Sequence, residues 1–93
     1  GSTCDALLSP TPGEITFAVN RARGSIAVAV SDEEAMAAMA FAAIEHKLTL
    51  EPGGAVALAA LLEGRVDVAG RTVVVVASGG NVDPALLARA LTR

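Results

Sequence analysis

The sequence predicts an α/β fold built on a parallel sheet. Four consecutive valines, Val73–Val76, form an apolar run without alternation, which is typical of a strand covered on both faces. A shorter β-branched run covers residues 25–30, and helical patterns follow each run. This alternation of strands and helices is typical of layered α/β domains with right-handed crossovers, although only two strands can be assigned.

Size and composition favour a single segment whose surfaces are covered by neighbours. The chain has 93 residues, 53% of them hydrophobic but only 2% aromatic, so small side chains dominate. The longest apolar run, residues 35–44, is shorter than the roughly 18 residues of a membrane span. Gly1-Ser2 resembles the remnant of an expression vector, which leaves 3–93 as one segment.

Charge and cysteine content exclude several classes of function. A net charge of −3 with scattered basic residues argues against binding of nucleic acid. The single cysteine, Cys4, excludes an internal disulfide and fits a reducing compartment. One Cys and one His cannot form a structural zinc site. We therefore expect an acidic cytoplasmic protein that binds no metal, nucleic acid or membrane.

The first half of the chain carries one ambiguous segment and one clear helix. Glu14–Asn20 alternates like a strand, but two arginines and a glycine follow it, as at the end of many helices. Ser31 and Glu34 form a capping box that begins a helix running to about Lys47. Its large apolar residues occupy more than half of the circumference, so we expect it to be buried on more than one side.

Two further helices are predicted from caps and turns. Glu51-Pro52-Gly53-Gly54 opens a helix over about 54–63, in which three leucines share one face. Asp83 as N-cap and Pro84 at the first helical position begin a last helix that ends near Thr92.

The candidate site is the segment Ser78-Gly79-Gly80-Asn81, at the predicted carboxyl end of the valine strand. Open α/β sheets bind ligands at that end of their strands. Ser78 can donate or accept a hydrogen bond, Asn81 offers an amide, and Gly79 and Gly80 allow a flat ligand to approach the backbone. The alternative is a turn in which the two glycines only supply unusual backbone angles.

Three other residues, Glu51, His46 and Cys4, carry groups that could take part in chemistry. Glu51 is either a simple loop acid or a carboxylate that faces a cofactor and influences its protonation. His46 is predicted to lie on the surface at a helix end, and nothing marks Cys4 as a nucleophile. Ser78–Asn81 lacks the lysine and the spacing of a phosphate-binding P-loop.

Three segments together resemble one enzyme family. LTLEPGGAVALAALLEG (48–64) and TVVVVASGGNVD (72–83) resemble the carboxyl-terminal part of threonine/serine dehydratases, and TCDALLSPTPGEITFAVN (3–20) resembles the segment before it. These enzymes are pyridoxal-phosphate ammonia-lyases, with serine racemase and hydroxyaspartate dehydratase as relatives. The resemblance implies a tryptophan-synthase-β-like three-layer fold (PLP fold type II), incomplete here. It also implies that 3–93 belongs to the large PLP-binding domain, and it favours a helix over Glu14–Arg21.

The resemblance also implies roles for individual residues. The serine equivalent to Ser78 hydrogen-bonds the pyridine nitrogen of pyridoxal phosphate, and a neutral hydroxyl leaves that nitrogen largely unprotonated. The remaining cofactor contacts implied are Gly79, Gly80, Asn81, Glu51 and Ala6, the last at a position where relatives often carry glycine.

The Schiff-base lysine, the phosphate loop and the metal ligands of that family lie upstream of the matching segments. Lys47, the only lysine, stands where the motif does not place the catalytic one. We therefore expect a fragment of a dehydratase of threonine, serine or hydroxyaspartate that is not catalytic alone and binds no cofactor alone. Its expected partners are the missing upstream part of the enzyme and, through exposed apolar surface, further copies of itself. The alternative is a self-sufficient small α/β binding or interaction module.

Overall fold

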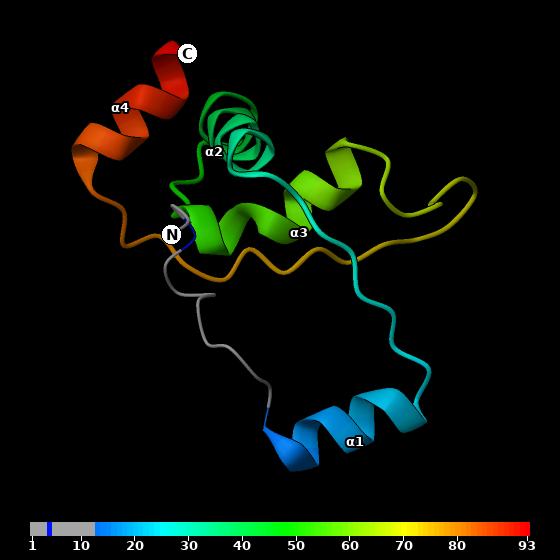
Figure 1. Ribbon diagram of the computed structural model, residues 1–93. Helices are drawn as coiled ribbons and strands as arrows, with labels where there is room; N and C mark the ends of the chain where they lie inside the picture. Colours follow the sequence, from blue (N-terminus) through cyan, green and yellow to red (C-terminus); the bar gives the residue numbers. More distant parts are fainter. Residues whose placement is uncertain (1–3, 5–12) are drawn as a thin grey trace.

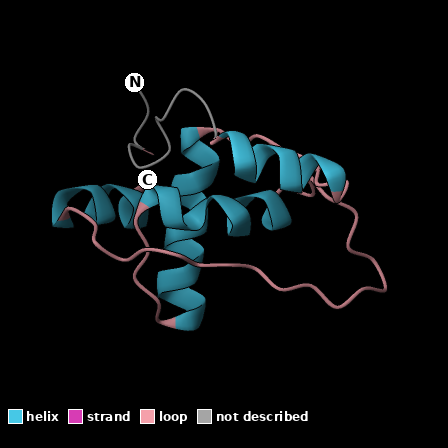
Figure 2. Cartoon of the chain, turned by 90° about the horizontal axis from the view of Figure 1, so that it is seen from below, coloured by secondary structure: helices cyan, strands magenta, loops and turns pink. Residues whose placement is uncertain are grey.

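The computed structural model describes Cys4 and residues 13–93. This part of the chain forms four helices and contains no strand (Figures 1 and 2). The helices are α1 (Glu14–Ala22), α2 (Asp32–His46), α3 (Pro52–Leu62) and α4 (Pro84–Thr92). The predicted α/β fold with a parallel sheet is therefore wrong for the described residues.

The two segments predicted as strands are extended but unpaired. Residues 71–80 pass alongside α3, and residues 25–30 lead from α1 to α2 (Figure 1). Val74 is 87% exposed and Val76 is 67% exposed, the opposite of a strand covered on both faces. Valine favours an extended backbone, but a strand also needs a neighbour that takes up its hydrogen bonds, and the described chain provides none.

All four predicted helices are confirmed, and local signals account for their starts. The Ser31 hydroxyl accepts a bond from the Glu34 backbone N–H at 3.1 Å, and the Glu34 carboxylate accepts one from the Ser31 N–H at 2.8 Å. The Asp83 carboxylate accepts a bond from the Ala85 N–H at 2.9 Å at the start of α4. Lys47 ends α2 in the left-handed conformation, with φ of 57°.

The core lies where α2 packs against α3 and α4 (Figure 1). The prediction that α2 is buried on more than one side is therefore confirmed. Met39 is fully buried, and the other buried core side chains are mostly alanines, which allow the helix axes to approach closely. The buried residues of this core are Met36, Ala38, Met39, Ala42, Leu50, Ala55, Ala59 and Ala90.

Helix α1 differs from the other three because it packs against none of them in the described structure. It contains no buried residue, and its apolar side chains Ile15, Phe17 and Val19 are 82%, 52% and 49% exposed. The helical interpretation of this segment is confirmed and the strand pattern was misleading. No described helix is both long enough and apolar enough to cross a membrane.

Candidate functional site

The two motifs that carry the family resemblance meet in space, backbone against backbone. The Glu51 N–H donates a hydrogen bond of 2.8 Å to the Gly79 carbonyl. A Cβ added to Gly54 would lie 2.6 Å from both the nitrogen and the carbonyl oxygen of Gly79. A Cβ added to Gly80 would lie 2.7 Å from the Thr49 carbonyl oxygen. Residues 49–54 and 78–80 therefore form one contact, called here the Glu51–Gly79 junction.

Backbone contacts leave no room for a Cβ at Gly54 or Gly80, whereas Gly79 faces the Glu51 side chain. A Cβ on Gly79 would lie only 2.0 Å from the Glu51 carboxylate oxygen Oε1, so that carboxylate lies directly over the glycine. Positive φ values among the described glycines occur at Gly24, Gly64 and Gly70, not in the junction. The interpretation of Gly79 and Gly80 as suppliers of unusual backbone angles is therefore wrong.

Glu51 is positioned by the start of α3. It occupies the N-cap position, yet its side chain makes no capping hydrogen bond. Pro52 follows at the first helical position, where the missing N–H costs nothing. The half-buried carboxylate thus lies at the start of α3 and beside the Gly79 backbone.

Ser78 and Asn81 are exposed on either side of the two glycines. Within the described part of the chain, neither side chain takes part in a hydrogen bond. The Ser78 hydroxyl and the Asn81 amide are therefore accessible to a ligand. Ala6, the remaining predicted contact, lies outside the described residues.

None of the contacts found for His46 and Lys47 involves the Glu51–Gly79 junction. His46 is exposed at the end of α2, as predicted, with its ring 5.4 Å from the Phe41 ring. Cys4 is buried. The Lys47 ammonium donates to the Ile44 carbonyl at 2.6 Å. The described residues contain no group of three or more His, Cys, Asp or Glu side chains that could hold a metal ion.

An ion pair that no sequence signal indicated joins the Arg65 guanidinium to the Glu34 carboxylate. It connects the loop after α3 to the first turn of α2. The pKa of Glu34 lies below its ordinary value of 4.5, first because the Ser31 backbone N–H donates to the carboxylate and further because Arg65 lies beside it. The capping pattern identified Glu34, but nothing marked Arg65 as its partner.

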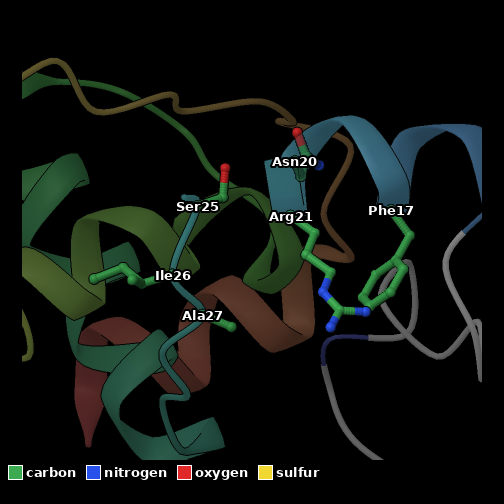
Figure 3. Close-up of a pocket in the computed structure, with 6 residues that line it drawn as sticks. All are labelled: Phe17, Asn20, Arg21, Ser25, Ile26 and Ala27. Atoms are coloured by element: carbon green, nitrogen blue, oxygen red, sulfur yellow. The ribbon is translucent and has the colours of Figure 1, made fainter. Parts of the chain in front are cut away.

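A hollow lies between α1 and the following extended segment (Figure 3). The Arg21 guanidinium lies beside the Phe17 ring, and Ser25 and Ile26 come from the extended segment (Figure 3). None of the predicted site residues lines this hollow, whose lining is Phe17, Asn20, Arg21, Ser25, Ile26 and Ala27. Its side chains are exposed and come from a helix that packs against no other described helix.

Comparison with known proteins decides the family. Residues 1–79 match the family described as "Pyridoxal-phosphate dependent enzyme". The chain belongs to this pyridoxal-phosphate-dependent enzyme family. The match ends at Gly79, so it includes Glu51 and Ser78 of the junction. The resemblance inferred from the two motifs is thereby confirmed.

Individual members of the pyridoxal-phosphate-dependent family align with almost the whole chain. It is 35% identical to the L-threonine ammonia-lyase of Thermotoga maritima over 96% of this chain and 22% of that protein. It is 37% identical to the phenylserine dehydratase of Ralstonia pickettii over 97% of this chain and 28% of that protein. It is 37% identical to the L-threo-3-hydroxyaspartate ammonia-lyase of Saccharomyces cerevisiae over 76% of this chain and 22% of that protein. The chain thus spans less than a third of the length of each.

Proposed function

We propose that this chain is part of a pyridoxal-phosphate-dependent ammonia-lyase and forms the side of the cofactor pocket that faces the pyridine nitrogen. The observation that carries the proposal is the hydrogen bond from the Glu51 N–H to the Gly79 carbonyl. It brings together the two motifs on which the family resemblance depends.

The residues at the junction fit the cofactor. The Ser78 hydroxyl is exposed and can donate to a neutral pyridine nitrogen, for which a hydroxyl is a suitable partner. The Glu51 carboxylate lies over Gly79, the residue after Ser78. The resemblance implies Asn81, Gly80 and Ala6 as the remaining contacts. When bound, pyridoxal phosphate supplies the electron sink that an elimination of this kind requires. The role of this chain is to hold the cofactor ring and to set the protonation of the pyridine nitrogen.

The substrate class follows from what the relatives have in common. Their names specify threonine, phenylserine and hydroxyaspartate, all of which carry a hydroxyl group on the β-carbon of an amino acid. We propose a small β-hydroxy-amino acid, such as threonine, serine or hydroxyaspartate, as the substrate of the complete enzyme, which acts in the cytoplasm.

Catalysis requires residues beyond those of this chain. Its single lysine, Lys47, is bonded through its ammonium group to the Ile44 carbonyl at the end of α2. The partner that completes the site is the remainder of a longer enzyme, and the isolated chain is inactive. Incubation with pyridoxal phosphate and borohydride, followed by intact-mass measurement, should yield no stable adduct. An adduct on Lys47 would overturn this part of the proposal.

A chimaera tests the function directly. Residues 3–93 are joined to the upstream part of the Thermotoga L-threonine ammonia-lyase in place of its matching segment, and ammonia release from threonine is measured. Ser78→Ala should lower kcat about tenfold to a hundredfold, the equivalent of leaving one buried polar group unpaired. Ser25→Ala is the matched control and should have no effect. An active, cofactor-binding chimaera whose kcat is unchanged by Ser78→Ala would contradict the role assigned to Ser78.

A further inference from the structure

Gly54, in the first turn of α3, packs against the backbone of Gly79, the residue that follows Ser78. A Cβ added to Gly54 would lie 2.6 Å from the Gly79 nitrogen and 2.6 Å from the Gly79 carbonyl oxygen. Both are backbone atoms, so neither can turn aside as the end of a flexible side chain can. Gly54 is itself buried, beside the buried Ala55. A side chain therefore fits at Gly54 only if one of the two backbones shifts.

This contact acts directly on Ser78, because the Gly79 nitrogen belongs to the peptide group that joins the two residues. A peptide group is planar, so the Gly79 nitrogen and the Ser78 Cα move as one rigid unit. The Gly79 carbonyl is held in turn by the Glu51 N–H, at 2.8 Å. The start of α3 thus fixes the chain on the carboxyl side of Ser78 through one close contact and one hydrogen bond.

The Ser78 side chain has no other anchor within the described part of the chain. It is exposed, and its hydroxyl takes part in no hydrogen bond there. The place of the hydroxyl therefore depends on the backbone that carries it. That backbone is set by Gly54 and Glu51 at Gly79, and by the contact of Gly80 with the Thr49 carbonyl.

We propose that Gly54 is a positioning residue for Ser78, since the absence of a side chain at Gly54 decides where the Ser78 hydroxyl lies relative to a ligand held by the rest of the enzyme. The inference rests on the proposed function, in which Ser78 donates to the pyridine nitrogen. Ordinary Cβ contacts begin at 3.4 Å, so a Cβ at position 54 requires the two backbones to separate by about 0.8 Å. A hydrogen bond of about 2.8 Å that is lengthened by this amount is no longer a hydrogen bond.

The chimaera proposed above is used to test this role, with kcat expressed per bound cofactor so that unfolded protein is not counted. Gly54→Ala should lower kcat about tenfold, because the Ser78 hydroxyl leaves hydrogen-bond range. Ala57→Ser also adds one heavy atom to α3, but at an exposed position. It is the matched control and should leave kcat unchanged.

A double-variant cycle separates positioning from a general loss of structure. If Gly54 acts through Ser78, kcat of the Gly54→Ala, Ser78→Ala double variant should lie within about twofold of kcat for Ser78→Ala alone, since no hydroxyl is left to misplace. Gly80→Ala, whose Cβ would lie 2.7 Å from the Thr49 carbonyl oxygen, displaces the same segment and provides a second cycle. Effects that multiply in both cycles would overturn this inference alone. A Ser78→Ala variant with unchanged kcat would overturn the proposed function and this inference with it.

Two readouts other than activity complete the test. The absorption spectrum of the bound cofactor in the Gly54→Ala chimaera should approach that of the Ser78→Ala chimaera, because the surroundings of the pyridine nitrogen change in the same way. In the 93-residue chain, Gly54→Ala should speed hydrogen exchange at the Glu51 amide at least about tenfold relative to the amides of α2. A spectrum identical to that of the parent, or an unchanged exchange ratio, would overturn the proposal.

Discussion

The three packed helices α2, α3 and α4 bury apolar side chains, whereas α1 and the extended segments 26–30 and 72–77 expose theirs. In the first region Met39 is 0% exposed and the buried alanines of α2 and α3 lie at the helix contacts. In the second, Ile15 and Val74 are 82% and 87% exposed. An apolar segment is therefore buried only where a neighbouring element covers it. Substitutions in the two regions should consequently have very different effects on stability.

The largest expected effect is in the core. Met39→Ala should lower the free energy of unfolding by about 2–5 kcal/mol, because a fully buried side chain is removed and a cavity remains. Ile15→Ala on α1 should change it by less than about 0.5 kcal/mol. Urea unfolding followed by helical circular dichroism measures both. Equal losses in the two variants would remove the distinction between the regions.

Substitutions in the Glu51–Gly79 junction should cause the next largest loss of stability. Gly54→Ala puts a Cβ 2.6 Å from the Gly79 backbone, so the two motifs must separate. We expect a loss of about 1–3 kcal/mol from overpacking, even though alanine is the better helix former. Ala57→Ser, on an exposed position of the same helix, is the control. A stabilised Gly54→Ala variant, measured by the same unfolding experiment, would show that the close contact does not exist.

The sequence predicted the helices well because their signals are local. The capping box of Ser31 and Glu34 and the Asp83-Pro84 start act within one turn, and both appear in the structure. Pairing of the valine run depends on a partner strand elsewhere, and no local pattern shows whether that partner is present. The sheet prediction failed for that reason.

The candidate site was predictable in part. The resemblance placed Glu51 and Ser78 together, and the Glu51–Gly79 hydrogen bond agrees with that placement. The close contacts that explain Gly54 and Gly79 could not be foreseen, since they depend on how two distant backbones meet. The ion pair of Arg65 with Glu34 also escaped prediction because a loop arginine has no characteristic spacing to a helix start.

A smaller effect is expected at the start of α2. Ser31→Ala removes the hydroxyl that accepts from the Glu34 N–H, and should cost about 1 kcal/mol of stability in urea unfolding. Glu33→Gln is a suitable control because the Glu33 side chain is 82% exposed and its ion pair with Arg93 is long, at 3.7 Å. A Ser31→Ala variant as stable as the parent would mean that the cap is not formed in solution.

The capping box of Ser31 and Glu34 predicts that the stability of the fold depends on pH. The pKa of Glu34 in the folded chain is below 4.5, so its carboxylate stabilises the fold above that pH and the contribution is lost as the pH falls through the lowered value. Glu34→Gln keeps an acceptor for the Ser31 N–H but does not titrate. The stability difference between parent and variant should therefore shrink on acidification, as followed by the urea midpoint. If the stability difference between parent and Glu34→Gln stayed constant as the pH falls below 4.5, the pKa of Glu34 would not be lowered in the folded chain.

The smallest effect on stability is expected in the extended segment 72–77. Val74→Thr keeps the β-branched shape at a side chain that is 87% exposed. At a concentration low enough for monomers, we expect the unfolding free energy to change by less than about 0.5 kcal/mol. A loss as large as that of Met39→Ala would show that Val74 is covered within the single chain.

Residue-resolved hydrogen exchange of the dilute chain tests the central claim, that the two motifs form one junction while the valine run is unpaired. The Glu51 amide, bonded to the Gly79 carbonyl at 2.8 Å, should be protected, and the amides of Val74 and Val76 should exchange as fast as those of an unfolded chain. A Glu51 amide that exchanges as fast as the amide of Val74 would contradict the account.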